Sequence, residues 1–102
     1  MKTASIGEAR RFSLEGVEKV GLLDAGDLQV SLLCFEAGQR DEELVHHAGS
    51  VYQVLEGEAL VNADGDRERL GKGKVLAVGA GVPHVLENAG GGLLVVLVTR
   101  AR

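Results

Sequence analysis

Short apolar segments recur along the chain, and glycines separate them. Strand-length segments spaced by glycine-containing turns are typical of an all-β sandwich or barrel. The chain has 15 glycines and a single proline. The pattern predicts strands near residues 17–23, 28–36, 43–47, 50–56, 58–63, 67–70, 74–78, 84–88 and 92–99. No pattern repeats at solenoid spacing, so a repeat architecture is not expected.

One of these segments, Ser50–Glu56, alternates between two faces. Because successive side chains of a strand point to opposite sides of a sheet, Ser50 and Tyr52 share one face. Val51 and Leu55 lie on the other face, where they would pack on a second sheet or on a partner subunit. The alternation therefore predicts that Ser50 and Tyr52 point into the same space.

Three short motifs predict turns. Asp64-Gly65 between two apolar runs is a strong hairpin signal. Glu56-Gly57-Glu58 is typical of a tight turn with solvated acids. The Gly90–Gly92 triplet precedes the β-forming run LLVVLV rather than a helix. It is therefore interpreted as a flexible hairpin turn and not as a phosphate-binding loop.

The first residues differ from the rest of the chain. A short helix is expected near Ile6 to Arg11. We interpret residues 1–16 as an N-terminal segment, either a short helix or an edge strand. Residues 17–102 would then form the barrel, and a chain of 102 residues suits this single domain.

Composition narrows the classes of partner. The formal net charge is −4, which argues against a nucleic-acid partner, since phosphate binding needs a surplus of Lys and Arg on one face. Most basic residues are scattered. Those near the ends, including Arg100 and Arg102, are interpreted as belonging to solvated termini.

The single cysteine and the apolar runs bear on location. Cys34 lies within the apolar run VSLLCFEAG, so burial as a small hydrophobe is expected. No intrachain disulfide is possible, and the first residues do not read as a signal peptide. No apolar run approaches the ~18 residues of a membrane span. A cytoplasmic protein without a membrane partner is the expectation.

Two segments combine glycines with histidines at defined spacings. The later one, GKVLAVGAGVPHVLEN, contains Gly73, Gly79, Gly81, His84 and Asn88. The earlier one contains Gly38, Leu44, His46, Ser50 and Gly57.

In spacing and order these segments resemble the two motifs of the cupins, in particular the small single-domain cupins of the RmlC-like superfamily. The second cupin motif runs Gly, five residues, Pro-x-Gly, two residues, His, three residues, Asn. This chain departs from it only at Gly79, where proline is usual. The first runs Gly, five residues, His-x-His, three or four residues, Glu, six residues, Gly. The resemblance covers roughly residues 17–99 and implies a double-stranded β-helix, a jelly-roll barrel with an internal pocket.

The resemblance also implies a metal site, and this chain has two of its four ligand residues. Cupins hold their metal with the two histidines and the glutamate of the first motif and the histidine of the second. Here His46 and His84 match, whereas Leu44 and Ser50 replace a histidine and the glutamate. Zinc and iron sites usually take at least three protein ligands. A divalent transition metal (Zn, Fe, Mn or Ni) would therefore be held weakly.

Neighbouring residues offer substitutes for the missing ligands. His47 faces away from His46 unless a bulge re-aims it. Glu42 shares strand parity with Leu44 and His46, so it could point toward the pocket mouth. Tyr52 could present its phenol to the pocket. The expected pocket residues are thus His46, His84, Ser50, Tyr52 and Leu44, with His47 and Glu42 as further metal-ligand candidates.

Three functions stay open from the sequence. The favoured one is a cupin without full metal ligation that binds a small organic ligand in a mostly apolar pocket. The second is a metal-dependent enzyme of the dioxygenase or isomerase type. The third is a metal-free enzyme like the sugar epimerases, with His46 or His84 as general base and Tyr52 as general acid. The fold cannot choose among them.

A homodimer is expected by resemblance, since cupins often pair through their sheets. The apolar run LLVVLV (residues 93–98) is expected to form a sheet edge that suits this role.

Overall fold

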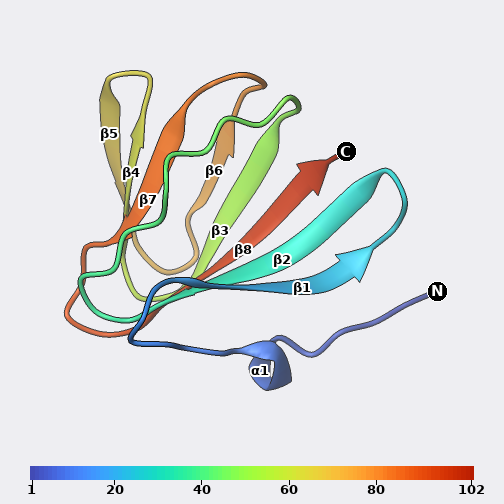
Figure 1. The fold of residues 1–102 in the computed structure, drawn as a ribbon, viewed down its shortest axis with the longest axis horizontal. Helices are drawn as coiled ribbons and strands as arrows, with labels where there is room; N and C mark the ends of the chain where they lie inside the picture. The colour runs from blue at the N-terminus through green and yellow to red at the C-terminus, as the bar shows by residue number, and fades with distance from the viewer.

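The computed structural model describes residues 1–102 and contains one short helix and eight strands (Figure 1). The elements are α1 (Ile6–Ala9), β1 (Glu18–Asp24), β2 (Leu28–Phe35), β3 (Ser50–Glu56), β4 (Ala59–Ala63), β5 (Asp66–Leu70), β6 (Val75–Val78), β7 (His84–Asn88) and β8 (Leu94–Ala101). The predicted all-β class is therefore confirmed. No helix is long and apolar enough to cross a membrane.

The strands form two antiparallel sheets. The larger sheet has the order β1-β2-β8-β3-β6, and the smaller one has the order β5-β4-β7. In Figure 1 the larger sheet curves from β6 down to β1, while β4, β5 and β7 stand to one side of it. Each sheet pairs one consecutive hairpin, β1–β2 or β4–β5, with strands that are distant in sequence, such as β8 beside β2 and β7 beside β4, as in a jelly roll. This confirms the predicted barrel of two wrapped sheets.

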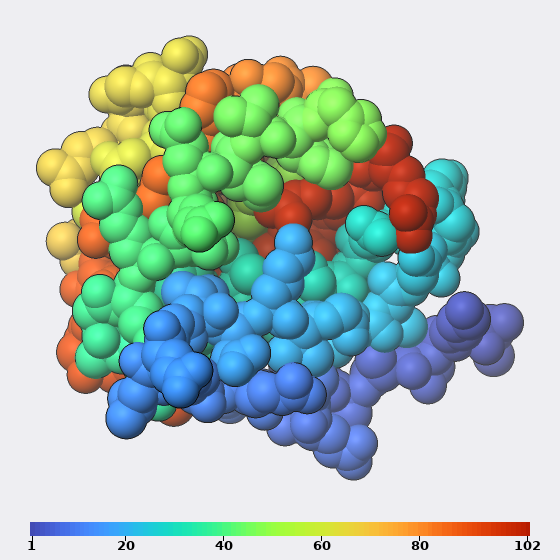
Figure 2. Space-filling view, in the orientation of Figure 1, coloured from blue at the N-terminus to red at the C-terminus, as the bar shows by residue number.

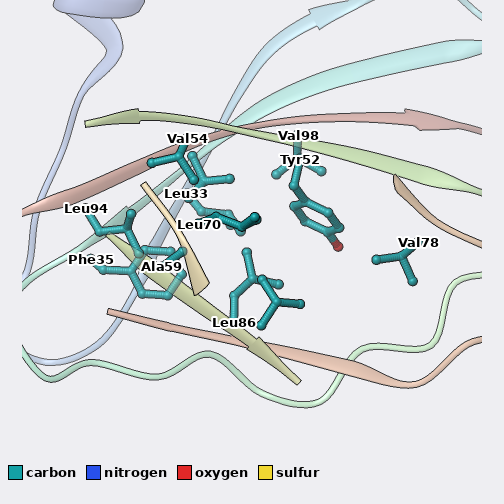
Figure 3. Close-up of a cluster of buried hydrophobic side chains, with 12 residues drawn as sticks. Leu33, Phe35, Tyr52, Val54, Ala59, Leu70, Val78, Leu86, Leu94 and Val98 are labelled. Carbon is teal, nitrogen blue, oxygen red and sulfur yellow. The ribbon is translucent and has the colours of Figure 1, made fainter. Parts of the chain in front are cut away.

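The inward faces of the two sheets make the main core. Twelve buried side chains pack together there, among them Phe35, Tyr52, Val54 and Leu94. Full burial of such a side chain contributes about 1.5–3 kcal/mol. In Figure 3 the apolar groups gather around Phe35 and Leu94, and the Tyr52 hydroxyl points away from them. The end of the barrel around Phe35 and Leu94 is therefore filled, and the Tyr52 hydroxyl lies on the side away from it, toward Val78.

A second, smaller cluster lies on the outer face of the larger sheet. It consists of Leu32, Cys34 and Val95, all buried. Ala9 and Phe12 from the N-terminal segment pack against it. The predicted burial of Cys34 is confirmed. The N-terminal segment serves as a cover for this face of the sheet.

The strand predicted at residues 43–47 is wrong. This stretch contains only an isolated bridge between Leu44 and His84. It nevertheless lies beside β7, because Asp41 N–H donates to Leu86 O and Leu44 N–H donates to His84 O. The two donors are three positions apart in the sequence, whereas their acceptors are two positions apart. The extra residue prevents a regular ladder, as in a bulge.

Two expectations for the last strand are also wrong. The Gly90–Gly92 triplet joins β7 in the smaller sheet to β8 in the larger one, so it is a crossover and not a hairpin turn. The run at residues 93–98 is not an edge, because β8 lies between β2 and β3. Its apolar character follows from burial at the centre of the sheet.

The predicted hairpin at Asp64-Gly65 is confirmed. Both residues have positive φ, 51° and 83°, and they connect the paired residues Ala63 and Asp66. Positive φ at both central positions is the geometry of a type I′ turn, which matches the twist of the flanking strands.

Candidate functional site

The inward face of the larger sheet changes from apolar to polar along its strands. One row of cross-strand neighbours contains Gln29, Arg100 and Ser50. The next row contains Ser31, Val98 and Tyr52. The row of Leu33, Val96 and Val54 is wholly apolar and belongs to the core. The polar rows therefore mark the end of the barrel where a site can form.

Arg100 is the central side chain of this polar end. It is 8% exposed, and its Nε donates to Ser50 Oγ over 3.0 Å. Its Nη2 donates to the Tyr52 hydroxyl over 2.7 Å. The interpretation of Arg100 as part of a solvated terminus is therefore wrong. Strand alternation explains its burial, because Arg100 shares parity with the inward-facing Val96 and Val98.

Tyr52 and His84 continue the hydrogen-bond chain. The Tyr52 hydroxyl lies 2.5 Å from His84 Nε2, and His84 Nδ1 lies 2.9 Å from Val82 O. A carbonyl can only accept, so Nδ1 carries the proton and Nε2 accepts from the phenol. The chain thus runs in one direction, from Arg100 through Tyr52 to His84. Every buried polar tip in it has a partner.

Burial governs the ionisation of the phenol. Loss of contact with water raises the pKa of Tyr52 above its ordinary value of 10.0. The hydrogen bond and the charge of Arg100 act in the opposite direction, but burial dominates. Tyr52 is therefore a neutral phenol at neutral pH and a donor to His84.

The other candidate residues lie apart from this chain. His46 is half-buried, and its Nε2 donates to Ala101 O over 3.0 Å. His47 is exposed, with its ring centroid 4.5 Å from that of His46. Glu42 is exposed, and Leu44 pairs with His84 through backbone hydrogen bonds in both directions. The structure unites Ser50, Tyr52 and His84 through Arg100, but it does not join His46 to them.

These residues do not fit the divalent metal that the sequence motif suggests. No three His, Cys, Asp or Glu side chains are grouped so that they could hold an ion. His84 Nε2 is occupied by Tyr52, and His46 Nε2 donates to a carbonyl. The guanidinium of Arg100 sits against Ser50, at the position where the motif has its glutamate. A fixed cation there repels a metal ion.

An open cavity of about 890 Å³ adjoins the polar end of the sheet. Its polar lining comprises Lys2, Thr3, Lys19, Asp24, Gln29, Ser31 and Arg100. Figure 2 shows this face hollowed, with the red C-terminal strand at the bottom of the hollow. The lining differs from the mostly apolar pocket expected from the sequence, because the apolar inward side chains pack on one another. Of the hydrogen-bonded chain, only Arg100 lines the cavity; Ser50, Tyr52 and His84 are buried beside it.

Sequence reasoning missed Arg100, the residue that links the cavity to the buried chain. The signal was present, since strand parity in LLVVLVTR places Arg100 on the same face as Val96 and Val98. What the sequence did not show was that β8 lies beside β3, where Ser50 and Tyr52 receive its hydrogen bonds.

Comparison with known proteins agrees with this architecture. A family model described as Cupin domain matches residues 31–100. The chain is 27% identical to an RmlC-like cupin protein from Desulfovibrio desulfuricans, with a TM-score of 0.87 over 99% of this chain and 96% of that one. It is 25% identical to TT1209 from Thermus thermophilus, with a TM-score of 0.91 over 99% and 97%. No match was found among curated proteins.

A third solved structure bears on the fold alone. It is an uncharacterized conserved protein with a double-stranded β-helix domain from Klebsiella pneumoniae. The identity is 24% and the TM-score 0.88, over 95% of this chain and 86% of that one.

Proposed function

This chain belongs to the cupin domain family, and on that premise we propose that it binds a small organic molecule in the open cavity beside Arg100. The volume of about 890 Å³ falls within the range of small-molecule sites, roughly 300–1,000 Å³. The single observation that carries the proposal is the buried chain of Arg100, Tyr52 and His84. A barrel whose interior served only for packing would not need it, because buried polar groups cost free energy unless they are paired.

The hydrogen-bond chain supports binding because it holds Arg100 in place. Two oxygen acceptors fix the guanidinium, so little side-chain freedom is lost when a ligand contacts it. Such preorganisation favours affinity in a small domain that has few loops to close over a ligand.

A two-dimensional amide NMR titration with a library of small metabolites tests the proposal. We expect some members to shift resonances of Gln29, Ser31 and Arg100, which line the cavity. Leu14, which is 88% exposed and distant from the cavity in the N-terminal segment, provides a control resonance. Ligands that shift only residues outside the cavity, or a library without any ligand, would refute the proposal.

Metal-free acid–base catalysis is the second candidate, and the contact between Tyr52 and His84 favours it. A general base and a general acid lie within hydrogen-bond distance, at 2.5 Å. Both are buried, so Arg100 would have to move before a substrate could reach them. His84 would then remove a proton from a carbon next to a carbonyl, and Tyr52 would return one.

Deuterium wash-in tests this second candidate. A panel of keto sugars incubated with the protein in D2O should acquire carbon-bound deuterium if the reaction occurs. His84→Gln should abolish the exchange, whereas His47→Gln, at an exposed histidine, should leave it intact. Exchange that persists in His84→Gln excludes His84 as the base.

Elemental analysis tests the metal-dependent alternative. We expect wild-type protein to carry much less than one equivalent of transition metal, because the donor set is incomplete. Leu44→His/Ser50→Glu should still bind poorly, since the new carboxylate would pair with Arg100. The same double variant with Arg100→Ala should bind metal. A full equivalent of metal in the wild type would contradict the proposed metal-free site and would favour the metal-dependent enzyme.

A further inference from the structure

Arg100 is a buried cation without an anionic partner. The ion pairs of the structure join Arg10 to Glu56, Arg69 to Glu58 and Arg102 to Asp24. Arg100 belongs to none of them, although it is 8% exposed. Its two hydrogen bonds go to the neutral hydroxyls of Ser50 and Tyr52. The positive charge is thus fixed in position but is not neutralised.

Arg100 keeps donors that the protein does not engage. A guanidinium carries five N–H groups, and two of its nitrogens are engaged here, by Ser50 and Tyr52. Nη1 makes no hydrogen bond to the protein, yet it is not among the fully buried unpaired atoms. Arg100 is the only member of the hydrogen-bonded chain that lines the cavity, so a molecule bound there can reach these donors.

Burying a charge without a counter-ion is costly, and this makes the site receptive to an anion. Hydrogen bonds to neutral hydroxyls offset part of the free-energy cost of removing a guanidinium from water, whereas an ion pair with a carboxylate would offset more of it. The cupin motif has a glutamate at position 50, and its carboxylate would neutralise this cation. Ser50 stands there instead and carries no charge. A bound anion would supply the missing partner.

The residues around Arg100 also favour an anion. Two further cationic residues, Lys2 and Lys19, line the cavity. Its one carboxylate, Asp24, accepts from Gly26 N–H over 2.9 Å and is paired with Arg102. Asp24 is therefore already compensated. The cavity is cationic although the whole chain has a net charge of −4.

We propose that the ligand of this cavity is a small organic anion whose carboxylate binds Arg100. The planar fork of a guanidinium matches a carboxylate with two parallel hydrogen bonds. Gln29 and Ser31 provide further hydrogen-bonding groups for the rest of the molecule. This inference rests on the proposed function, since it specifies the chemical class of the molecule in the same cavity.

Matched pairs of carboxylates and amides test the inference. Benzoate with benzamide, nicotinate with nicotinamide and lactate with lactamide differ in charge but little in shape. Binding is followed through the NMR signal of the Arg100 side-chain Nε–H. We expect at least one carboxylate to bind about ten- to a hundredfold more tightly than its amide, since hydrogen bonds to charged groups are the stronger ones. Inorganic phosphate serves as a separate arm, and phosphate binding without carboxylate binding would overturn the choice of a carboxylate.

Two variants separate the role of Arg100 from that of net charge. Arg100→Gln should abolish the preference for the carboxylate, whereas Arg11→Gln, at an exposed arginine, should keep it. If Arg100→Gln does not fold, Arg100→Lys keeps the charge but not the fork and should weaken binding by about tenfold. Equal binding of acids and amides to the wild type would overturn the inference and leave the proposed function standing. Failure of every small molecule to bind at the cavity would overturn both.

Discussion

At the residue scale, the site depends on what stands opposite Arg100. A glutamate at position 50 would form an ion pair with the guanidinium, whereas Ser50 accepts one hydrogen bond and leaves the charge free. Tyr52 then links the cation to His84 without neutralising the charge of Arg100. The hydroxyl at position 50 therefore leaves the guanidinium of Arg100 without a counter-ion, which is the condition on which the proposed anion site depends.

The ionisation of Tyr52 offers a direct test at this scale. It is the only tyrosine, and the chain has no tryptophan, so its near-ultraviolet absorbance is easily followed. Because burial raises its pKa, we expect Tyr52 to titrate at higher pH in the folded protein than in urea. The corresponding stability is present below pH 10.0 and is lost as the pH rises through the pKa of the folded state.

The charged neighbours of Tyr52 define the control for this titration. Arg100 from β8 lowers the pKa of Tyr52, Asp41 raises it, and His84 from β7 accepts the proton of its hydroxyl. Arg100→Gln should therefore move the titration to still higher pH. A folded-state midpoint at or below the value in urea would show that the phenol is not buried as described.

At the element scale, two turns with similar backbone conformation serve different purposes. Gly57 (φ 85°) joins β3 to β4, and Gly65 (φ 83°) joins β4 to β5. A Cβ on Gly57 would lie 2.2 Å from Leu93 O, whereas a Cβ on Gly65 would meet open space. The turn at Gly57 therefore packs against the crossover before β8, whereas the turn at Gly65 only connects two strands of a hairpin.

Alanine substitutions at these glycines separate conformation from contact. Gly65→Ala should lower the free energy of unfolding by about 1–2 kcal/mol, the cost of the left-handed conformation. Gly57→Ala should cost about 3 kcal/mol or more, since the backbone of Leu93 must also move. Urea denaturation of both variants measures the difference. Equal losses would mean that the close approach at Gly57 relaxes without cost.

The N-terminal segment allows a second prediction at the element scale. We propose that residues 17–102 form the barrel and that residues 1–16 cover its outer face, where Phe12 packs on the cluster containing Cys34. Phe12→Ala should lower the free energy of unfolding by about 1–3 kcal/mol, less than for a fully buried phenylalanine. It should also speed the reaction of Cys34 with a thiol reagent.

Leu14→Ala is the matched control for this cover. Leu14 belongs to the same segment but is 88% exposed, so neither stability nor thiol reactivity should change. A Cys34 thiol that reacts at the same rate in wild type and Phe12→Ala would show that the segment does not shield it.

At the scale of the whole molecule, the outer face of β3 and β6 remains uncovered. Val51 is 42% exposed and Val75 is 60% exposed, and Ala77, also exposed, is the cross-strand partner of Val51. The N-terminal segment covers the outer-face cluster of β2 and β8 instead. If the chain forms a homodimer, this apolar surface is where we expect the second copy to pack.

Light scattering tests the homodimer. We expect twice the monomer mass for the wild type and the monomer mass for Val51→Asp/Val75→Asp. Leu14→Asp adds a charge at an exposed apolar residue of the N-terminal segment, away from this surface, and should stay dimeric. A wild-type protein that is monomeric at high concentration would refute the homodimer.

Much of the architecture was predictable from the sequence, because its signals are local. Alternation and glycine spacing located all eight strands, and Asp64-Gly65 located a hairpin, since side-chain parity and positive φ are properties of a few adjacent residues. The cupin resemblance added the barrel. Parity also placed Ser50 and Tyr52 on the inward face, and the structure has both buried there.

Strand neighbours were decided only by the tertiary structure. The hydrogen bonds of Arg100 span 50 residues to Ser50 and 48 to Tyr52, and they exist because β8 pairs with β3. The same pairing places the last apolar strand at the centre of the sheet rather than at its edge. A sequence pattern states which face a side chain occupies but not which strand lies beside it. The cation at the barrel end, and the ligand chemistry that we infer from it, therefore depend on the folded sheet.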